Sequence, residues 1–307
     1  MPAAASFDVI IIGGGPAGIS CGLELHESKL NVVVLERKDQ LGGQLADIRN
    51  TLRNFAGGFY ESGEPLRVQM AALADQVGLP YLTGHAVTGI DLATKLLTAE
   101  KKKFKAKAIV LATGYRVTRL GVGDEDSFGK DISYQSEDIV DHLSGHPIAV
   151  IGGGDSALME ALFFADRCPQ VYLVHRGTKF KARPDVIKTV ESQKRIKVIV
   201  DTVVHALHGD RELTGVRLAS TTTGRTTDLP VKRLLVKIGY TPNTERFAGQ
   251  VKMDASGHIL VDQECATSMP GVFAAGDIAH PGYPRIGTAM GQGMIASWAV
   301  RRYLGMA

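Results

Sequence analysis

Short runs of apolar residues, rich in valine and isoleucine, recur along the chain and alternate with stretches of helical spacing. Such runs are typical of strands that are buried on both faces of a parallel sheet. The runs interpreted as strands are Val9–Ile12, Val32–Leu35, Ala108–Gly114, Pro147–Ile151, Val171–Val174 and Gly271–Ile278. Leu66–Val77 carries apolar residues three and four positions apart, and Thr288–Tyr303 is a helical stretch punctuated by glycines. The alternation predicts an α/β fold built on parallel sheets.

The first apolar run leads directly into a glycine-rich turn, GGGPAG, at residues 13–18. Its glycines have the spacing G-x-G-x-x-G, which lets the backbone approach a dinucleotide pyrophosphate at a helix N-terminus. Glu36 ends the next run, 23 residues after Gly13, at the place where an acidic residue binds ribose hydroxyls. These elements in register predict a dinucleotide site. Its predicted residues are Gly13, Gly15, Pro16, Ala17, Gly18 and Glu36.

The same pattern returns in the second half of the chain. A strand-like run leads into GGGDSA at residues 152–157, and the following run ends at His175, again 23 residues after the first glycine. This repeat predicts a second dinucleotide site. Cations replace the acid here and attract a 2′-phosphate that a carboxylate would repel, so we interpret the site as one that prefers NADP(H) to NAD(H). An ordinary solvated basic surface is the alternative. The predicted residues are Gly152, Gly154, Asp155, Ser156, His175, Arg176 and Lys181.

The composition indicates a globular protein and argues against a nucleic-acid-binding or membrane-spanning one. Charged residues make up 22% and apolar residues 44% of the 307 positions, which is typical of a globular protein, and the length fits two domains. A formal net charge of +3 is too small to indicate nucleic acid binding. No apolar run approaches the length of a membrane span, and the N-terminus does not resemble a signal peptide, so we expect a cytoplasmic protein without a membrane partner.

The cysteine positions indicate whether the chain forms disulfides or binds a metal. The three cysteines, Cys21, Cys168 and Cys265, lie far apart, so neither a disulfide framework nor a metal site is expected.

The run EKKKFKAKA at residues 100–108 is interpreted as the edge of a β-hairpin, because lysines on an edge strand prevent pairing with other chains. A basic docking patch is the alternative interpretation of these lysines.

Together these stretches resemble the low-molecular-weight thioredoxin reductases, a family of flavoproteins with two dinucleotide sites. The motifs run in the family's order and cover nearly the whole chain: GGGPAG, GGQL at 42–45, ATG at 112–114, GGGDSA, GYTPNT at 239–244 and GVFAAGD at 271–277. The resemblance implies two Rossmann-like domains and a homodimer. An NAD(P)H-binding domain at residues 117–241 would be inserted into a FAD-binding domain formed by residues 1–116 and 242–307.

The resemblance also implies roles for single residues. Glu36 would bind the adenosine ribose of FAD, and Asp277 would bind the ribitol chain. The other residues implied to lie along FAD are Gln44, Asn54, Val87, Thr113, Gly276, Ile286 and Gly287. In the inserted domain, Asp155 and Ser156 would cap the helix over the pyrophosphate of the nicotinamide cofactor.

One stretch departs from the family pattern. Thioredoxin reductases carry a Cys-x-x-Cys pair shortly before the second glycine motif, and this chain has Gln135 and Asp138 at those positions. Without two thiols, no internal dithiol carries electrons to a partner disulfide. An acid at the second position, together with QLGGQL at 40–45 and DHLSG at 141–145, resembles the thioredoxin-reductase-like ferredoxin/flavodoxin–NADP⁺ reductases.

Asp138 is the candidate catalytic residue. Facing the flavin, it would tune the flavin potential or relay a proton, and a solvent-facing helix cap is the alternative. The resemblance thus implies a flavoprotein that passes electrons from NADPH, with NADH as the second candidate donor, through FAD to ferredoxin, flavodoxin or a similar carrier. Two alternatives stay open. One is a reductase or oxidase that uses oxygen, a small molecule or an external disulfide, and the other is a flavin-binding dimer without catalysis.

Overall fold

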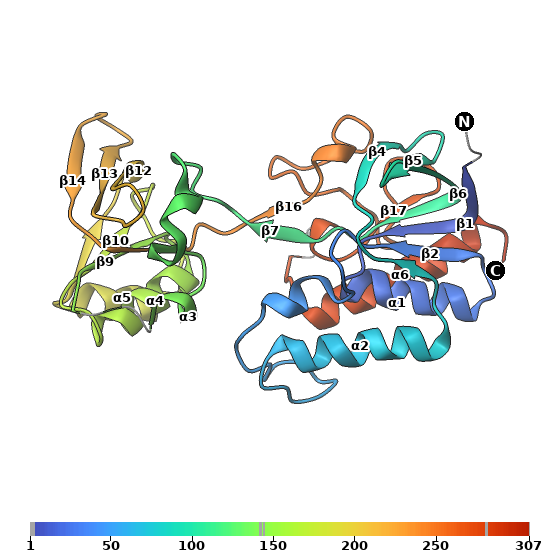
Figure 1. Ribbon diagram of the computed structural model, residues 1–307, viewed down its shortest axis with the longest axis horizontal. Coiled ribbons are helices and arrows are strands. Elements are labelled where there is room, and N and C mark those ends of the chain that lie inside the picture. Colours follow the sequence, from blue (N-terminus) through green and yellow to red (C-terminus); the bar gives the residue numbers. More distant parts are fainter. Residues whose placement is uncertain (1–3, 141–142, 144, 280–281, 307) are drawn as a thin grey trace. The chain divides into compact units, whose positions relative to one another are not determined.

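The computed structural model describes residues 4–140, 143, 145–279 and 282–306. Asp141, His142 and Ser144 of the DHLSG stretch therefore lie outside the described residues. The chain forms two compact units: unit 1 comprises residues 1–116 and 241–307, and unit 2 comprises residues 117–240. The chain passes between the units in two strands that pair with each other, β7 (Tyr115–Val117) and β16 (Tyr240–Pro242) (Figure 1).

Unit 1 is built on a seven-stranded sheet with the order β3-β2-β1-β6-β5-β4, in which β17 also pairs with β6. The parallel strands are β1 (Ala5–Ile12), β2 (Val32–Leu35), β3 (Tyr81–Leu82), β6 (Lys102–Leu111) and β17 (Val272–Ala274). The antiparallel strands are β4 (Val87–Asp91) and β5 (Leu96–Ala99). The second half of β1, residues 9–12, and the whole of β2 are uninterrupted apolar runs because side chains on both of their faces are buried.

The interpretation of residues 100–108 as a sheet edge is wrong. Strand β6, which contains these lysines, pairs with β1 on one side, and on the other side it pairs with β5 along Lys102–Lys105 and with β17 along Ile109–Leu111. The hairpin itself is present, because β5 and β6 are antiparallel neighbours. The lysine side chains are exposed, but β6 is an interior strand, and Lys105 is paired on both sides while Lys102 and Lys103 pair with β5. Side-chain polarity therefore gave no information about edge pairing.

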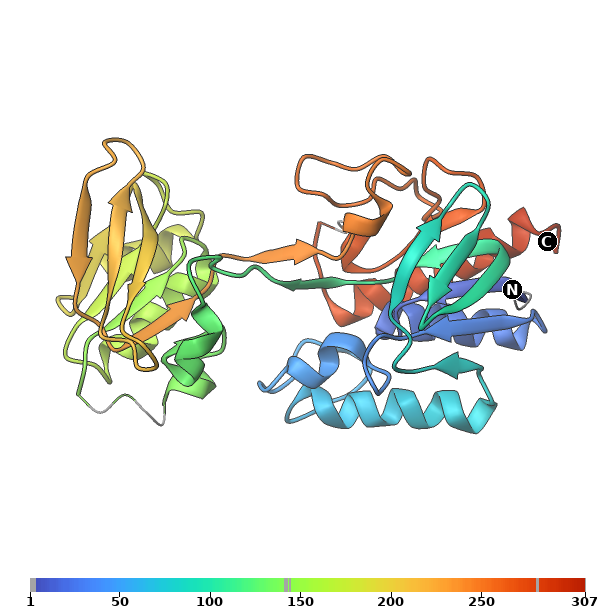
Figure 2. The same ribbon diagram turned by 45° about the horizontal axis from the view of Figure 1, so that its top comes forward.

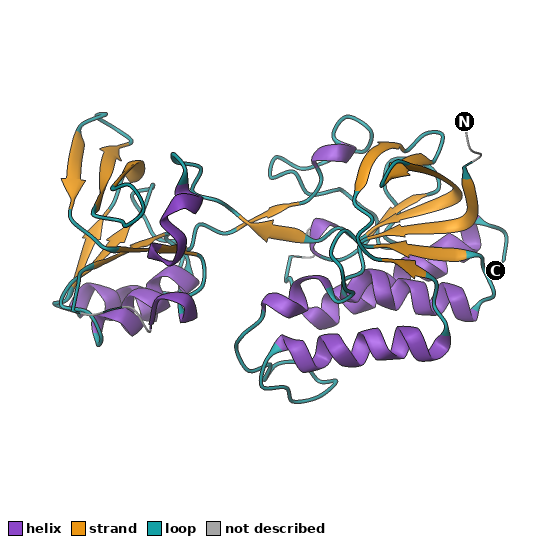
Figure 3. Cartoon of the chain, viewed as in Figure 1, coloured by secondary structure: helices purple, strands orange, loops and turns teal. Residues whose placement is uncertain are grey.

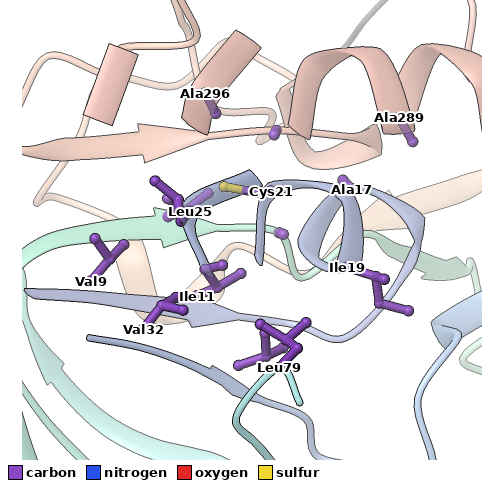
Figure 4. Packing of buried hydrophobic residues seen from close by; sticks show 14 of the residues in the cluster. Val9, Ile11, Ala17, Ile19, Cys21, Leu25, Val32, Leu79, Ala289 and Ala296 are labelled. Carbon is purple, nitrogen blue, oxygen red and sulfur yellow. The ribbon is translucent and has the colours of Figure 1, made fainter. Parts of the chain in front are cut away.

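Alternate residues of each strand in unit 1 enter two different layers. Val9 and Ile11 of β1 pack against helices on one face, and Ile10 and Ile12 pack against the β4–β5 hairpin and residues 247–259 on the other. The helices on the first face are α1 (Pro16–Glu27), α2 (Gly63–Val77) and α6 (Ile286–Tyr303) (Figure 3). Figure 4 shows this layer, with Cys21 of α1 among apolar side chains.

Unit 2 has three layers of its own. A five-stranded parallel sheet has the order β11-β10-β9-β15-β8. Its strands are β8 (Ile132–Ser133), β9 (Ile148–Ile151), β10 (Val171–Val174), β11 (Ile196–Ile199) and β15 (Arg233–Val236). Helices α4 (Asp155–Ala165) and α5 (Pro184–Ser192) cover one face. A separate antiparallel sheet covers the other face (Figure 2), and its strands are β12 (Thr202–His208), β13 (Gly215–Ser220) and β14 (Thr226–Leu229).

Short helical segments complete both units. They are α3 (Glu137–Val140) and the 3-10 turns η1 (Gly43–Asp47), η2 (Glu125–Asp131), η3 (Glu245–Phe247) and η4 (Asp277–Ala279). Strands β2 and β10 have the bounds that the sequence predicts, whereas α5 was not predicted. Among the described residues, no helix combines the length and the apolar character that a membrane span requires.

Candidate functional site

The first glycine turn lies between β1 and α1. Gly13 has a φ of +110°, and a Cβ there would lie 2.2 Å from the carbonyl oxygen of Ala112. A Cβ on Gly18 would lie 1.9 Å from the oxygen of Gly13, so close packing alone excludes a side chain at both positions. Gly15 differs, because a Cβ there would meet only the Cα of Gly43, 3.9 Å away. The space above Gly15 is therefore open, as close approach of a pyrophosphate requires.

The start of α1 leaves amide groups available to a ligand. Gly15 occupies the N-cap in an extended conformation, Pro16 and Ala17 are the first helical residues, and no side chain caps the helix. The first amides of such a helix have no partner within the helix, and the helix dipole favours an anion there. The residues present fit the phosphates of a dinucleotide.

Glu36 is the buried acid of the first turn. Its side chain follows β2, is 5% exposed, and accepts hydrogen bonds from the amides of Gly14 (2.7 Å) and Lys38 (2.8 Å). Two amide donors leave acceptor capacity on a carboxylate, which fits additional ribose hydroxyls. The backbone oxygen of Glu36 accepts from the amide of His85 (2.8 Å), so the chain leading to Val87, the half-buried first residue of β4, starts beside this acid.

A second group of predicted residues lies close to the first glycine turn, because a Cβ on Gly43 would come within 2.9 Å of Gly15 and a Cβ on Gly276 within 3.0 Å of Ala17. Gln44 of η1 donates a hydrogen bond to Asp277, the first residue of η4, and burial raises the pKa of Asp277 to about 6. Gly276 has a φ of +82° and donates its amide to Gln292 of α6 (2.9 Å). A Cβ on Gly114 would lie 3.2 Å from the Gln44 amide nitrogen. Three segments far apart in the sequence thus meet around the Gln44–Asp277 pair.

The remaining predicted FAD residues have mixed surroundings. Ile286 and Gly287 begin α6, whose first turn carries no acid and no side-chain cap. The Thr113 hydroxyl donates to the backbone oxygen of Asn243 (2.8 Å), so its hydrogen is already engaged in a bond within the protein. Asn54 is exposed on the loop between η1 and α2. The structure therefore brings Glu36 to the glycine turn and Gln44 to Asp277.

The second glycine turn, between β9 and α4, repeats the backbone geometry of the first. Gly152 has a φ of +150°, and a Cβ there would lie 2.2 Å from the backbone oxygen of Lys237. Gly154 is the extended N-cap of α4, and a Cβ on it would meet only the oxygen of Lys181, 3.9 Å away. The space above Gly154 is open in the same way as the space above Gly15.

His175 and its neighbours surround this second turn. The imidazole lies against Gly153, where a Cβ would come within 2.2 Å of the ring. Its Nε2 is 3.0 Å from the oxygen of Lys179, which fixes the ring orientation. Arg176 and Lys181 are exposed, and the Lys181 amide donates to the oxygen of Gly153 (2.7 Å). Cations therefore border the glycine turn at the place where the first site has a carboxylate.

The expectation that Asp155 and Ser156 cap α4 is wrong. Gly154 occupies the N-cap, no side chain caps the helix, and Asp155 is already the first helical residue. The Asp155 carboxylate instead accepts from the amide of Arg183 (2.8 Å) and so ties the following loop to the helix start. Ser156 is exposed in the first turn.

Sequence reasoning missed how far the repeat extends. The residue 29 positions after the first glycine of each turn donates its amide to the middle glycine: Gly42 to Gly14 and Lys181 to Gly153, both at 2.7 Å. The residue after the neighbouring strand is also equivalent, because the carbonyls of Ala112 and Lys237 each touch the first glycine. The members of each pair differ in residue type, so the sequence carried no signal for these backbone contacts.

The stretch that replaces the expected cysteines borders a cavity of about 280 Å³ in unit 2. Asp138 lies half-buried inside the first turn of α3 and accepts from the Ser133 hydroxyl (2.9 Å). The Tyr134 hydroxyl donates to the buried Glu125 (2.7 Å), and burial raises the pKa of Tyr134 to about 12. The residues that line the cavity are Arg119, Glu125, Asp126, Gly129, Ile132, Ser133, Tyr134, Gln135 and Asp138.

All three cysteines are free and buried. Burial raises the pKa of Cys168 and of Cys265 to about 11, and it raises the pKa of Cys21 further. A thiol with such a pKa is not a thiolate at neutral pH and does not act as a nucleophile. Among the described residues, no group of three or more metal-ligating side chains could hold a metal ion.

Comparisons with known proteins agree with this geometry. A family model described as pyridine nucleotide-disulphide oxidoreductase matches residues 7–293. A thioredoxin reductase of Listeria monocytogenes is 32% identical over 301 residues, which cover 97% of this chain and 94% of the relative. The 34.2 kDa protein in the rubredoxin operon of Clostridium pasteurianum is 30% identical over 301 residues, with 97% of each chain covered.

Solved structures show the same similarity. The crystal structure of Lactococcus lactis thioredoxin reductase in its FR conformation has a TM-score of 0.80 and 28% sequence identity, and the match covers 98% of this chain and 100% of that chain. The predicted fold class, α/β with two Rossmann-like dinucleotide-binding domains, is confirmed.

Proposed function

Because the chain belongs to the pyridine nucleotide-disulphide oxidoreductase family, we propose that it transfers electrons from NADPH through FAD to a separate redox carrier without an internal dithiol. The chain is an oxidoreductase of the thioredoxin reductase type, and its cofactors are FAD and NADPH. When bound, FAD accepts a hydride from NADPH and releases electrons singly or as a pair. The proposed acceptor is ferredoxin, flavodoxin or a similar carrier.

The observation that carries this proposal is the absence of a redox-active thiol pair. Gln135 and Asp138 occupy the two positions where the resemblance expects cysteines, and the three cysteines of the chain are buried elsewhere. A chain without an accessible dithiol needs an acceptor that takes electrons from the flavin directly. The name of the clostridial relative, taken from a rubredoxin operon, supports a carrier protein as that acceptor.

The proposed binding roles follow the two glycine turns. In unit 1, the amides at the start of α1 would hold the FAD pyrophosphate, Glu36 the adenosine ribose, and Asp277 with Gln44 the ribitol. In unit 2, the amides at the start of α4 would hold the pyrophosphate of NADPH, and Arg176 and Lys181 would bind its 2′-phosphate.

A homodimer is part of the proposal. Helix α6 exposes Met294, Ile295 and Trp298, which are 42–51% exposed in the single chain. A second copy of the chain would cover such an apolar face. Measurement of the mass in solution by light scattering tests this part, and a monomer at micromolar concentration contradicts it.

Anaerobic stopped-flow spectroscopy of the FAD-loaded protein tests the main proposal. We expect NADPH to bleach the flavin absorbance, and we expect reoxidation by ferredoxin or flavodoxin to be faster than reoxidation by oxygen. Rapid turnover with thioredoxin as the sole acceptor would overturn the proposal. Fast reoxidation by oxygen alone would favour an oxidase, and a flavin that NADPH does not bleach would favour a dimer without catalysis.

Asp138 is proposed as a proton relay to the bound cofactor. It is half-buried and hydrogen-bonded to Ser133 at one wall of the 280 Å³ cavity. We expect Asp138→Asn to slow reoxidation of the reduced flavin by the carrier about tenfold or more, since this step releases a proton and general acid–base catalysis contributes effects of this size. Asp126→Asn is the matched control, because Asp126 lines the same cavity with a side chain that is 80% exposed. Equal rates for the two variants would leave Asp138 without a relay role.

A further inference from the structure

The strand order of unit 2 reverses beside β9. Strands β10 and β11 lie on one side of β9, and β15 and β8 lie on the other. In open parallel sheets, dinucleotides bind in the crevice at such a reversal, beyond the carboxyl ends of the strands. His175 and Arg176 at the end of β10 mark the adenosine side of this crevice. The nicotinamide side is therefore the side where β15 and β8 end.

Lys237 lies at this nicotinamide side. It directly follows β15, its amide donates to the oxygen of Ile151 (2.7 Å), and its carbonyl touches Gly152 of the glycine turn. The Lys237 ammonium donates to the backbone oxygen of Tyr134 (2.8 Å), which follows β8. One side chain thus links the ends of the two strands that border the crevice.

Glu160 of α4 forms the other half of a charge pair. Its carboxylate lies 3.8 Å from the Lys237 Nζ and accepts from the Ser136 hydroxyl (3.0 Å). The two side chains are 18% and 20% exposed. Charges that are removed from water to this extent interact more strongly with a neighbouring ligand than charges at the surface.

The scaffold itself does not need a lysine at this position. The equivalent residue in unit 1 is Ala112, whose carbonyl touches Gly13 as the carbonyl of Lys237 touches Gly152, both at 2.2 Å from a built Cβ. Its amide also bonds the preceding strand in the same way, at 2.8 Å. An alanine therefore supports the same turn, and the long cationic side chain of Lys237 calls for another explanation.

We propose that the Lys237–Glu160 pair borders the nicotinamide ring and balances the change of charge that the ring undergoes. This inference rests on the proposed function, in which NADPH binds at the second glycine turn. Loss of a hydride from C4 to FAD converts the neutral dihydronicotinamide into a cationic ring. A neutral pair beside the ring accommodates both states, whereas Glu160 alone favours the cationic ring and Lys237 alone disfavours it.

Equilibrium binding to the FAD-loaded protein tests the pair without turnover. The two probes are NADP⁺, with a cationic ring, and 1,4,5,6-tetrahydro-NADP, with a neutral ring that donates no hydride. We expect Lys237→Met to shift the ratio of the two Kd values about fivefold or more toward NADP⁺, and Glu160→Gln to shift it as far in the opposite direction. The double variant returns the ratio to within about twofold of the unmodified protein.

Arg233→Met is the matched control. Arg233 pairs with Asp131 at 2.6 Å, the two side chains are 19% and 16% exposed, and Arg233 lies at the opposite end of β15. The Arg233→Met substitution removes a similar ion pair far from the crevice, so we expect it to leave the ratio of the two Kd values unchanged. A shift with Arg233→Met as large as the shift with Lys237→Met would overturn the proposal.

The outcomes separate this inference from the proposed function. An unmodified protein that binds neither probe contradicts the proposed function, and the inference falls with it. Binding that persists in both variants with an unchanged ratio, or with shifts of the same sign, overturns the inference alone. Glu160→Gln keeps an acceptor for the Ser136 hydroxyl, so it tests the sign of the effect even where Lys237→Met does not fold.

Discussion

The turn after β1 and the turn after β9 share a backbone and differ in the side chains around it. In both turns the first glycine touches the carbonyl of the residue that follows the neighbouring strand, and the third is the open N-cap of a helix. The middle glycine of the first turn donates its amide to the Glu36 carboxylate (2.7 Å), whereas the middle glycine of the second is covered by the His175 ring.

This difference shows how one scaffold serves two ligands. The shared backbone contacts present amides to a pyrophosphate, which both cofactors contain. The side chains at fixed offsets distinguish the ligands: a buried carboxylate favours ribose hydroxyls, and exposed cations favour a 2′-phosphate. A third, structurally equivalent position, the residue whose carbonyl touches the first glycine, holds Ala112 in unit 1 and Lys237 in unit 2. Substitutions at each of these positions test how far the two sites differ.

The largest effect is expected where the two turns differ in packing. Gly18→Ala places a Cβ 1.9 Å from the oxygen of Gly13, so we expect it to cost more than about 3 kcal/mol of the free energy of unfolding and to abolish FAD retention. The equivalent position in the second turn already holds Ala157, and Ala157→Gly should cost only about 1–2 kcal/mol. Urea unfolding measures both, and similar losses would contradict the difference.

Glu36→Gln comes next. The carboxylate accepts two backbone amides while 5% exposed, and an amide side chain turns one acceptor into a donor that faces another donor. We expect the substitution to reduce the free energy of FAD binding by about 1.5–3 kcal/mol, which makes FAD binding at least about tenfold weaker. FAD titration of the apoprotein measures this. His175→Gln, the change at the equivalent position of unit 2, should leave FAD affinity unaltered.

Arg176→Ala addresses the opposite charge at the second turn. Loss of the guanidinium should raise the KM for NADPH about tenfold, since charge-assisted bonds to a phosphate are strong, and leave the KM for NADH nearly unchanged. Steady-state kinetics with both nucleotides measure this, and Lys188→Ala, an exposed cation on α5, is the control. A rise of equal size for NADPH and NADH would contradict selection of the 2′-phosphate by this residue.

The smallest effect concerns Asp277, a partly buried acid of the first site. Its folded-state pKa of about 6 lies above the ordinary value of 3.8, so the folded apoprotein loses stability as pH rises from about 4 to above 6. Asp277→Asn should remove this loss and stabilise the apoprotein by about 1 kcal/mol at pH 8, with no change at pH 4. Thermal unfolding at the two pH values measures the difference. The exposed Asp210→Asn should show none.

Much of the fold could be predicted because buried parallel strands leave a simple signal. Strands β2 and β10 are apolar at every position that the sheet buries on both faces, and their bounds follow from the sequence. The glycine turns were predictable because only glycine fits at Gly13 and Gly152. Edge and interior strands were not distinguishable for β6, since its lysines report where side chains point and not which backbone groups are paired.

The site was less predictable than the fold. The Lys237–Glu160 pair joins residues on different elements, and neither residue belongs to a local motif. Aspartate is a typical N-cap residue, but in α4 the N-cap is Gly154, and Asp155 is the first residue of the helix. The binding roles of single residues, the domain limits as functional boundaries and a cytoplasmic location stay predictions.

Strand β6 also has a consequence for the order in which the molecule is made. Its partner β17 and the helix α6 come from the C-terminal segment, whereas unit 2 is one continuous stretch of chain. A ribosome therefore releases every residue of unit 2 before unit 1 can close, and domains generally fold as units while they are synthesised. Until β17 emerges, the edge of β6 at Ile109–Leu111 lacks its neighbour. Unit 1, whose synthesis starts first, is therefore completed last, and one edge of its sheet stays unpaired until the C-terminal segment is made.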